Sequence, residues 1–232
     1  MKQREAEEAL QHITVAMGKA SERKVEVEEL SKKLVEEEKV IQVRKGGVEE
    51  ELADVQPLLE QARKAVGQIK SDNLNEIKSL KMPPDAIRDV LEGVLLLMGN
   101  HDTSWGSMRK FLSTRSVKED IINFDARRVN VADRTNVEKL LAQKGNNFEH
   151  ATIYRVSVAA APLAAWVKAN VRFSQVCEKI APLENELTDL KISLEASKTR
   201  LKQCEEELTQ LDEEVVRLKA EFGKKTGEAD NR

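Results

Sequence analysis

The chain has 232 residues, of which 34% are charged and only 3% are aromatic. This composition is too polar to fold the whole length around one compact core, and ten glycines and five prolines leave little material for the turns of an all-β fold. The net charge of −3 is uneven, because residues 70–172 carry 16 basic against 12 acidic side chains while both flanks are acidic. We therefore expect an extended helical protein. Its basic middle indicates either an acidic partner or ordinary solvated surface.

Residues 1–69 form a first arm, in which an apolar residue recurs at every seventh position. This row consists of Ile13, Ala20, Val27, Leu34, Ile41, Val48, Val55, Ala62 and Ile69. A companion row is apolar at its ends and polar in its middle: Leu10, Met17, Lys24, Ser31, Glu38, Lys45, Leu52, Leu59 and Val66. Heptad spacing of this kind predicts a long coiled-coil helix whose seam is weak at its centre.

Residues 70–172 carry start and stop signals for short helices instead. After Pro83-Pro84, a helix from Asp85 should stop at Gly99-Asn100. Thr103 or Ser104 should cap the next helix. Further helices are expected over residues 117–124, from Asp133 to residue 144, and over residues 148–171, which lead past Pro162 into the next arm. The segment predicts a small helical bundle with most of its aromatic side chains in the core.

Residues 173–232 form a second arm, with apolar residues at alternating steps of three and four. The seam runs through Phe173, Val176, Ile180, Leu183, Leu187, Leu190, Leu194, Ser197, Leu201, Cys204, Leu208, Leu211, Val215, Leu218 and Phe222. Two arms of similar length around a central globule predict an intramolecular antiparallel hairpin. The fold class is therefore all-α: a long antiparallel coiled coil capped by a helical-bundle tip.

The expected register sets the two weak stretches against each other, with Lys45 opposite Ser197 and Glu38 opposite Cys204. It also brings Pro57 and Pro182 to nearly the same height, as a kinked junction between stalk and tip or as two unrelated irregularities. The weak seam is either a tolerated defect or a means for one helix to slide past the other.

Two other architectures remain open at this point. A plain scaffold coiled coil would dimerise in parallel, and an arm-and-hinge protein of the SMC type would fold back around a larger hinge that contains strands. A zinc hook would need a Cys-x-x-Cys motif at the apex, which this sequence lacks.

Sequence motifs for chemistry are missing, so we expect no catalytic site, no cofactor and no metal. Neither a phosphate-binding glycine loop nor a metal-ligand spacing of His and Cys occurs. Cys177 and Cys204 would lie roughly 40 Å apart on one helix and could not pair there. No apolar run is long enough to span a membrane, and no aromatic–basic pattern indicates nucleic acid.

The tip resembles the microtubule-binding domain of dynein heavy chains, most closely that of cytoplasmic dynein 2, the ciliary retrograde motor. The resemblance rests on an ordered set of motifs: Lys78-Ser79-Leu80 before Pro83-Pro84, the run Leu95 to Gly99, Trp105 with Arg109, Ile121 to Phe124, Arg155 to Leu163, and Trp166. The segments around Pro57 and Pro182 resemble the stalk prolines of that family. The resemblance covers nearly the whole chain.

This resemblance implies a stalk that links an AAA+ ATPase ring of the same heavy chain to α/β-tubulin in the microtubule, with helix sliding relaying the nucleotide state. The expected location is the cytoplasm and cytoskeleton, including the cilium. Carried over by position, the implied microtubule-binding residues are Lys70, Lys78, Arg109, Arg155 and Arg115, the last of which lies one place from the family's basic position. The chain is then a piece of a longer motor and not an enzyme by itself.

The sequence departs from the better-known cytoplasmic pattern at two positions. Ser71 stands where a second lysine is common, and Ala151 where a glutamate precedes the matching arginine by one turn. Arg127-Arg128 is an additional basic pair, which either compensates or is solvated.

Overall fold

The computed structural model describes residues 2–230, and these are helical with no strand among them. In chain order the helices are α1 Lys2–Leu52, α2 Val55–Gly67, α3 Ser71–Ser79, α4 Asp85–Leu97, α5 Trp105–Leu112, α6 Val117–Ile122, the 3-10 helix η1 Ala126–Arg128, α7 Val131–Lys144, the 3-10 helix η2 Gly145–Phe148, α8 His150–Val156 and α9 Ala160–Asp230. The all-α prediction is confirmed, and a strand-containing hinge does not fit the described residues.

The chain divides into two compact units. Unit 1 comprises the residues up to Gly46 together with those from Glu184 onward, and unit 2 comprises Gly47–Leu183. The bundle is thus larger than the predicted 70–172, because α2 and the beginning of α9 contribute to its cores.

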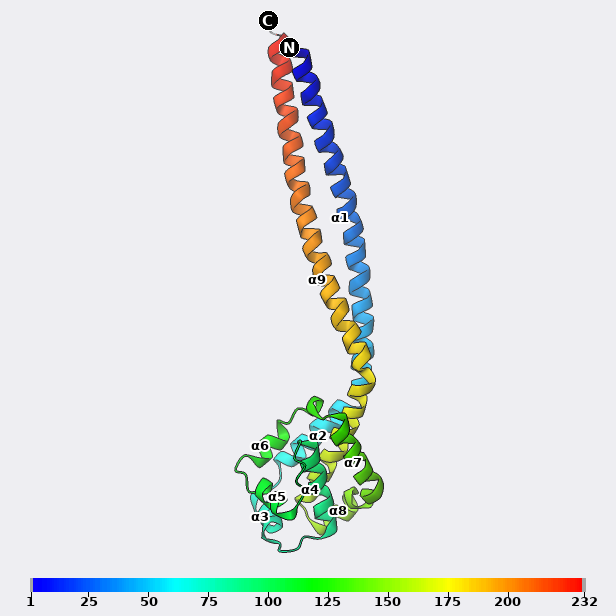
Figure 1. The fold of residues 1–232 in the computed structure, drawn as a ribbon, viewed down its shortest axis with the longest axis vertical. Coiled ribbons are helices and arrows are strands. Elements are labelled where there is room, and N and C mark those ends of the chain that lie inside the picture. The colour runs from blue at the N-terminus through cyan, green and yellow to red at the C-terminus, as the bar shows by residue number, and fades with distance from the viewer. Residues whose placement is uncertain (1, 231–232) are drawn as a thin grey trace. The chain divides into compact units, whose positions relative to one another are not determined.

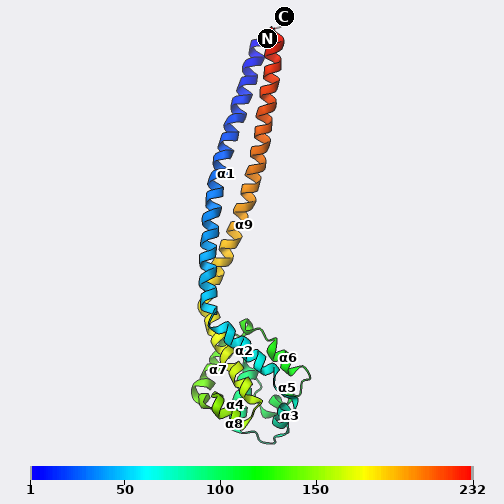
Figure 2. The ribbon, with the colours of Figure 1, turned by 180° about the vertical axis from the view of Figure 1, so that it is seen from behind.

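Unit 1 is an antiparallel pair made by α1 and α9, whose outer ends lie side by side (Figures 1 and 2). Ion pairs join the two helices: Arg23 Nε lies 2.5 Å from Glu207 Oε2, Arg200 Nη2 lies 2.7 Å from Glu26 Oε1, and Arg44 Nη2 lies 3.1 Å from Glu186 Oε1. The predicted intramolecular hairpin is confirmed. A parallel scaffold dimer does not fit this arrangement, because the seam residues that would contact a second chain already pair within one chain.

The register of this pair differs from the predicted one. Ser197 Oγ donates to Glu37 Oε1 at 3.3 Å and does not face Lys45, while the Cys204 thiol bonds to Glu26 and not to Glu38. The prediction matched weak stretches to each other. In the described register, α1 is displaced by eight to twelve residues from the predicted pairing, and ion pairs between flanking residues such as Arg23–Glu207 and Arg200–Glu26 form in it.

The companion row of the first arm is also different from the predicted one. Ala16, on the row that follows the Ile13 row by three residues, is buried, whereas Leu10 and Met17 are 49% and 47% exposed. The same inward row includes the half-buried Arg23 and Glu37. The helix is therefore turned so that several polar side chains occupy the seam, and the largest apolar cluster of unit 1 is confined to Ile41, Leu187 and Leu194 with Leu34 and Leu190.

The core of unit 2 is built around α4. Its residues Val90, Leu91, Val94 and Leu95 have no exposed surface, and they pack with side chains from α7, α8 and the beginning of α9, among them Trp166. Neighbouring helices approach α4 closely at Gly93, where an added Cβ would lie 3.1 Å from Val167 Cγ1. A continuous apolar face on a 13-residue helix thus organises the bundle.

A second core of unit 2 lies where the last turns of α1 and the beginning of α2 meet α9. Val48, Leu52, Val55 and Leu59 pack there against Phe173 and Ile180, and Ala126 of η1 closes the cluster. Residues predicted to be stalk seam therefore form part of unit 2.

The two prolines do not lie at the same height. Lys179 Nζ bonds to Glu51 Oε2 at 3.0 Å, and in this antiparallel register Pro57 and Pro182 are offset by about 13 Å along the helices. Their effects differ too, since α1 ends at Leu52 and Pro57 lies in the first turn of α2, whereas α9 continues through Pro182. A proline is tolerated in a first turn because the N–H that it lacks would be unpaired there.

Local signals in the tip were mostly predictive. The helix from Asp85 stops at Gly99, whose φ of +83° is favourable only for glycine, and Ser104 Oγ caps α5 by accepting from Ser107 N at 3.3 Å. The start of α7 was misplaced: its cap is Asn130, whose Oδ1 accepts from the N–H of Asp133 at 2.7 Å.

Candidate functional site

Three short helices, α3, α5 and α8, lie toward one end of unit 2 (Figures 1 and 2). The indole N–H of Trp105, the first residue of α5, donates to the carbonyl oxygen of Leu80 just after α3, at 3.1 Å. Leu80 is packed against the core, so this bond holds the end of α3 to the beginning of α5. The result is a surface of short helices supported by α4.

Three of the five predicted basic residues lie on these helices, and a fourth lies directly before one of them. Lys70 precedes α3, Lys78 lies in its last turn, Arg109 is on α5 and Arg155 on α8; Arg115 lies in the connection between α5 and α6. Lys78 is half-buried and the other four are exposed. Within residues 2–230 none of the five forms an ion pair with a carboxylate, so their charges are available to an external anion.

A groove joins the start of α3 to α8. Its volume is about 430 Å³, and its lining includes Lys70 and Asn73 on one side and His150 and Tyr154 of α8 on the other. The structure thus groups Lys70 with α8, and Lys78 with α5 through the Trp105 bond. Arg115, on a connecting turn, is tied to neither group by a hydrogen bond within the described residues.

Tyr154 departs from the expected core role of the aromatic residues. Trp166 and Phe148 are buried, but Tyr154 is 50% exposed and its ring stacks on the imidazole of His150, with centroids 5.3 Å apart. Sequence reasoning missed it as a surface residue. The available signal was its spacing of four from His150 on a short helix that also carries Arg155.

The additional basic pair Arg127-Arg128 is engaged inside unit 2. Arg128 Nε lies 4.0 Å from Asp125 Oδ2, and the Arg127 guanidinium lies 5.9 Å from the centroid of the Phe173 ring. The Arg128 side chain is 81% exposed, so of the two residues only Arg127 has a packing contact within unit 2.

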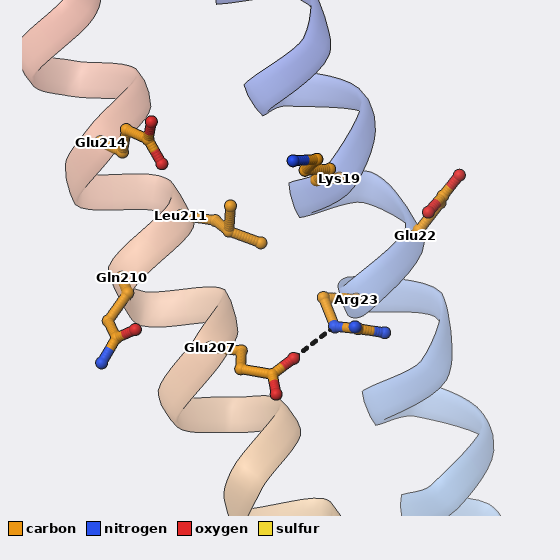
Figure 3. Close-up of a pocket in the computed structure, with 7 residues that line it drawn as sticks. All are labelled: Lys19, Glu22, Arg23, Glu207, Gln210, Leu211 and Glu214. Carbon is orange, nitrogen blue, oxygen red and sulfur yellow. Dashed lines mark ion pairs between the residues drawn. The ribbon is translucent and has the colours of Figure 1, made fainter.

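A second groove, of about 440 Å³, opens along the seam of unit 1 (Figure 3). Lys19 and Arg23 of α1 face Glu207 and Glu214 of α9 across it, and Leu211 points into it. The seam is therefore incompletely filled in this register.

The described residues hold no grouping of His, Cys, Asp and Glu that could bind a metal ion, and none of their helices is apolar enough to cross a membrane. His101 instead contacts the buried carboxylate of Asp133, with Nε2 2.7 Å from Oδ1. Burial, followed by its hydrogen bond to Glu26, raises the pKa of the Cys204 thiol, which disfavours the reactive thiolate.

Comparison with known proteins decides the family. A family model described as the microtubule-binding stalk of dynein motor matches residues 1–231. The chain belongs to this dynein stalk family. The resemblance inferred from the tip motifs is confirmed, and so is the assignment of both arms to the stalk family.

Among relatives of this dynein stalk, cytoplasmic dynein 2 heavy chain 1 of Chlamydomonas reinhardtii is 59% identical over 99% of the chain, and that of Homo sapiens is 50% identical over 97%. The cytoplasmic dynein heavy chain of Caenorhabditis elegans is 30% identical over 92%. The chain spans about 5% of the length of each of these relatives. A solved structure, the microtubule binding domain of dynein-C, is 25% identical and covers 58% of this chain and 94% of its own, with a TM-score of 0.49.

Proposed function

We propose that this dynein stalk binds the acidic surface of α/β-tubulin in the microtubule through the end of unit 2 that carries α3, α5 and α8. The observation that supports the proposal most directly is the gathering of unpaired basic side chains there. Lys70, Lys78, Arg109 and Arg155 contribute them, and Arg115 adds a charge at the adjoining turn. Unpaired cations on a rigid scaffold lose no internal partner when an external carboxylate replaces water.

Electrostatic attraction of this kind makes encounter fast and affinity dependent on salt, because exposed charges are screened over about 10 Å at 0.1 M ionic strength. Each exposed contact contributes only a fraction of the total affinity. Binding should therefore weaken gradually as single basic residues are removed.

We expect Lys78→Ala and Arg155→Ala each to weaken microtubule binding by about two- to fivefold, since one exposed ion pair is worth up to about 1 kcal/mol. Co-sedimentation with microtubules at two salt concentrations measures the effect, and far-UV circular dichroism verifies folding. Lys139→Ala on α7 is the matched control and should bind like the wild type. Unchanged binding by both site variants would remove these residues from the interface.

We also propose that the coiled coil changes register to relay the nucleotide state of an AAA+ ring in the same heavy chain. Three features of unit 1 support this idea: the polar inward row of α1, the exposure of Leu10 and Met17, and the partly filled seam at Leu211. Leu10 and Met17 would gain burial if α1 turned by one position. Burial of these two side chains in an alternative register would be favourable, and this gain reduces the free-energy difference between the two registers.

Cysteine cross-linking tests the relay in a background of Cys177→Ser and Cys204→Ser. Glu37→Cys with Ser197→Cys should trap the described register, and Ile41→Cys with Ser197→Cys should trap one that is shifted by about one turn. We expect both pairs to form and the two trapped proteins to differ in microtubule affinity. Cross-linking of the first pair alone would contradict sliding, and equal affinities would contradict a relay.

In this proposal ATP hydrolysis belongs to the ring and the stalk itself performs no catalysis. The similarity to cytoplasmic dynein 2 heavy chains supports a location on the cytoskeleton of the cytoplasm and cilium. An epitope-tagged full-length heavy chain observed in ciliated cells tests the location.

A further inference from the structure

The groove between α3 and α8 is mainly apolar, a feature that the basic residues beside it do not explain. Its remaining lining is dominated by small and apolar side chains: Ala65, Ile69, Val158, Ala159, Ala161, Pro162 and Ala165. No acidic residue is among those that line it. The lack of large side chains at five of these positions leaves the space open.

Exposed apolar groups lie on the α8 side of this groove. Tyr154 is 50% exposed and Val158 49%, and the neighbouring Val156 is 41% exposed. The Tyr154 ring stacks on His150, and this contact lowers the side-chain entropy that is lost when a partner covers the ring. Arg155 follows Tyr154 directly, and Lys70 lies in the opposite lining.

We propose that the groove receives an apolar side chain from the tubulin surface, with Tyr154 as the aromatic anchor, Lys70 as the basic residue of its lining and Arg155 as a second cation next to Tyr154 in α8. This inference rests on the proposed microtubule binding. Charge complementarity identifies the occupant: a mainly apolar groove with basic residues beside it and no carboxylate in its lining fits an apolar residue flanked by acidic ones, on an acidic protein surface. Val158 extends the apolar contact beyond the aromatic ring.

An apolar contact and a charged contact respond differently to salt. Removal of a lysine or arginine lowers the dependence of the dissociation constant on ionic strength, because screening acts on charges. Burial of an aromatic ring does not depend on screening in this range. Salt dependence therefore separates the role of Tyr154 from that of its basic neighbours.

We expect Tyr154→Ala to weaken microtubule co-sedimentation by about tenfold at every salt concentration, with an unchanged slope of affinity against ionic strength. Tyr154→Phe should retain most of the affinity because the ring is kept. Arg155→Ala should instead reduce the slope. Val131→Ala, an exposed apolar residue of α7, is the matched control and should behave as the wild type.

A groove-filling variant tests the same site without removal of a contact. Ala165 is exposed on α9 and lines the groove, so Ala165→Leu should preserve the helix and block entry, with a loss of affinity similar to that of Tyr154→Ala. Wild-type affinity of both Tyr154→Ala and Ala165→Leu, or a changed salt slope in Tyr154→Ala, would overturn the apolar contact and leave the proposed function standing.

Two further outcomes identify other failures. A wild-type chain that does not sediment with microtubules would overturn the proposed function and this inference together. Light scattering that shows a wild-type dimer dispersed by Tyr154→Ala would assign the groove to a second copy of the chain and overturn tubulin as its occupant.

Discussion

Glu92 on α4 shows how burial acts on a single residue. Burial raises the pKa of its carboxyl group, and the nearby Asp89 raises it further, while Arg88 acts in the opposite direction. Asp89 itself accepts a hydrogen bond from Asn147 Nδ2 at 2.7 Å, which holds the η2 segment to α4. The negative charge of Glu92 is therefore unfavourable in the folded state. Its neighbour Asp89, which adds to this effect, is the residue that bonds to Asn147.

Glu92→Gln should stabilise the protein at neutral pH. The folded pKa of Glu92 lies above its unfolded value, so the folded state binds this proton more tightly and ionisation costs stability at high pH. The gain should be complete above the folded pKa and vanish as the pH falls below the unfolded value of about 4.3. Thermal unfolding at pH 7 and near pH 4 measures it.

The exposed Glu119→Gln is the matched control for this prediction and should show no such gain. A gain for Glu92→Gln that is equal at both pH values would indicate packing rather than charge as its source.

At the scale of elements, caps and stops act locally, and helix boundaries follow them where no tertiary contact competes. The boundaries of α4 and α5 follow from Pro84, Gly99 and Ser104. The start of α7 does not, because Asn130 and Asp133 are both capping residues and the carboxylate of Asp133 bonds to His101, far away in the sequence. Asn130 is therefore the cap, while the carboxylate of Asp133 bonds to Asn130 Nδ2 and to the distant His101.

The break between α8 and α9 is a second case of this kind. The helical segment expected over residues 148–171 is interrupted after Val156, and Ala160 N donates to Ser157 Oγ at 3.1 Å where α9 begins. Ile153 is fully buried in the main core of unit 2, so packing sets the direction of α8 separately from that of α9.

Over the whole chain, the two units differ in how well their cores are filled. Unit 2 has a large core with many fully buried residues, and it contains both tryptophans. The largest apolar cluster of unit 1 rests on Ile41, Leu187 and Leu194, and polar residues occupy part of its seam. Stability is therefore expected to be unequal between the units.

We expect thermal unfolding to be non-coincident between two probes. Far-UV circular dichroism should begin to lose helix at a lower temperature than the fluorescence of Trp105 and Trp166 changes, because unit 1 unfolds first. Leu194→Ala, which removes about 2 kcal/mol or more of packing in unit 1, should advance the early loss of ellipticity and leave the fluorescence transition in place. Coincident transitions in the wild type would show that the chain unfolds as one cooperative unit.

The sequence by itself determined the hairpin, the helical tip and the basic residues of the candidate surface. Heptad spacing and local caps are properties of short segments, so both can be recognised without the fold, whereas the choice of Lys78 and Arg155 came from the family resemblance of the tip motifs. Tertiary structure decided the register, the inward row of α1, the offset of Pro57 and Pro182, and the exposure of Tyr154. The physical reason is that a heptad pattern repeats every seven residues and is satisfied by several registers. The choice among them depends on pairs such as Arg23 with Glu207, and the exposure of a side chain depends on residues distant in the sequence.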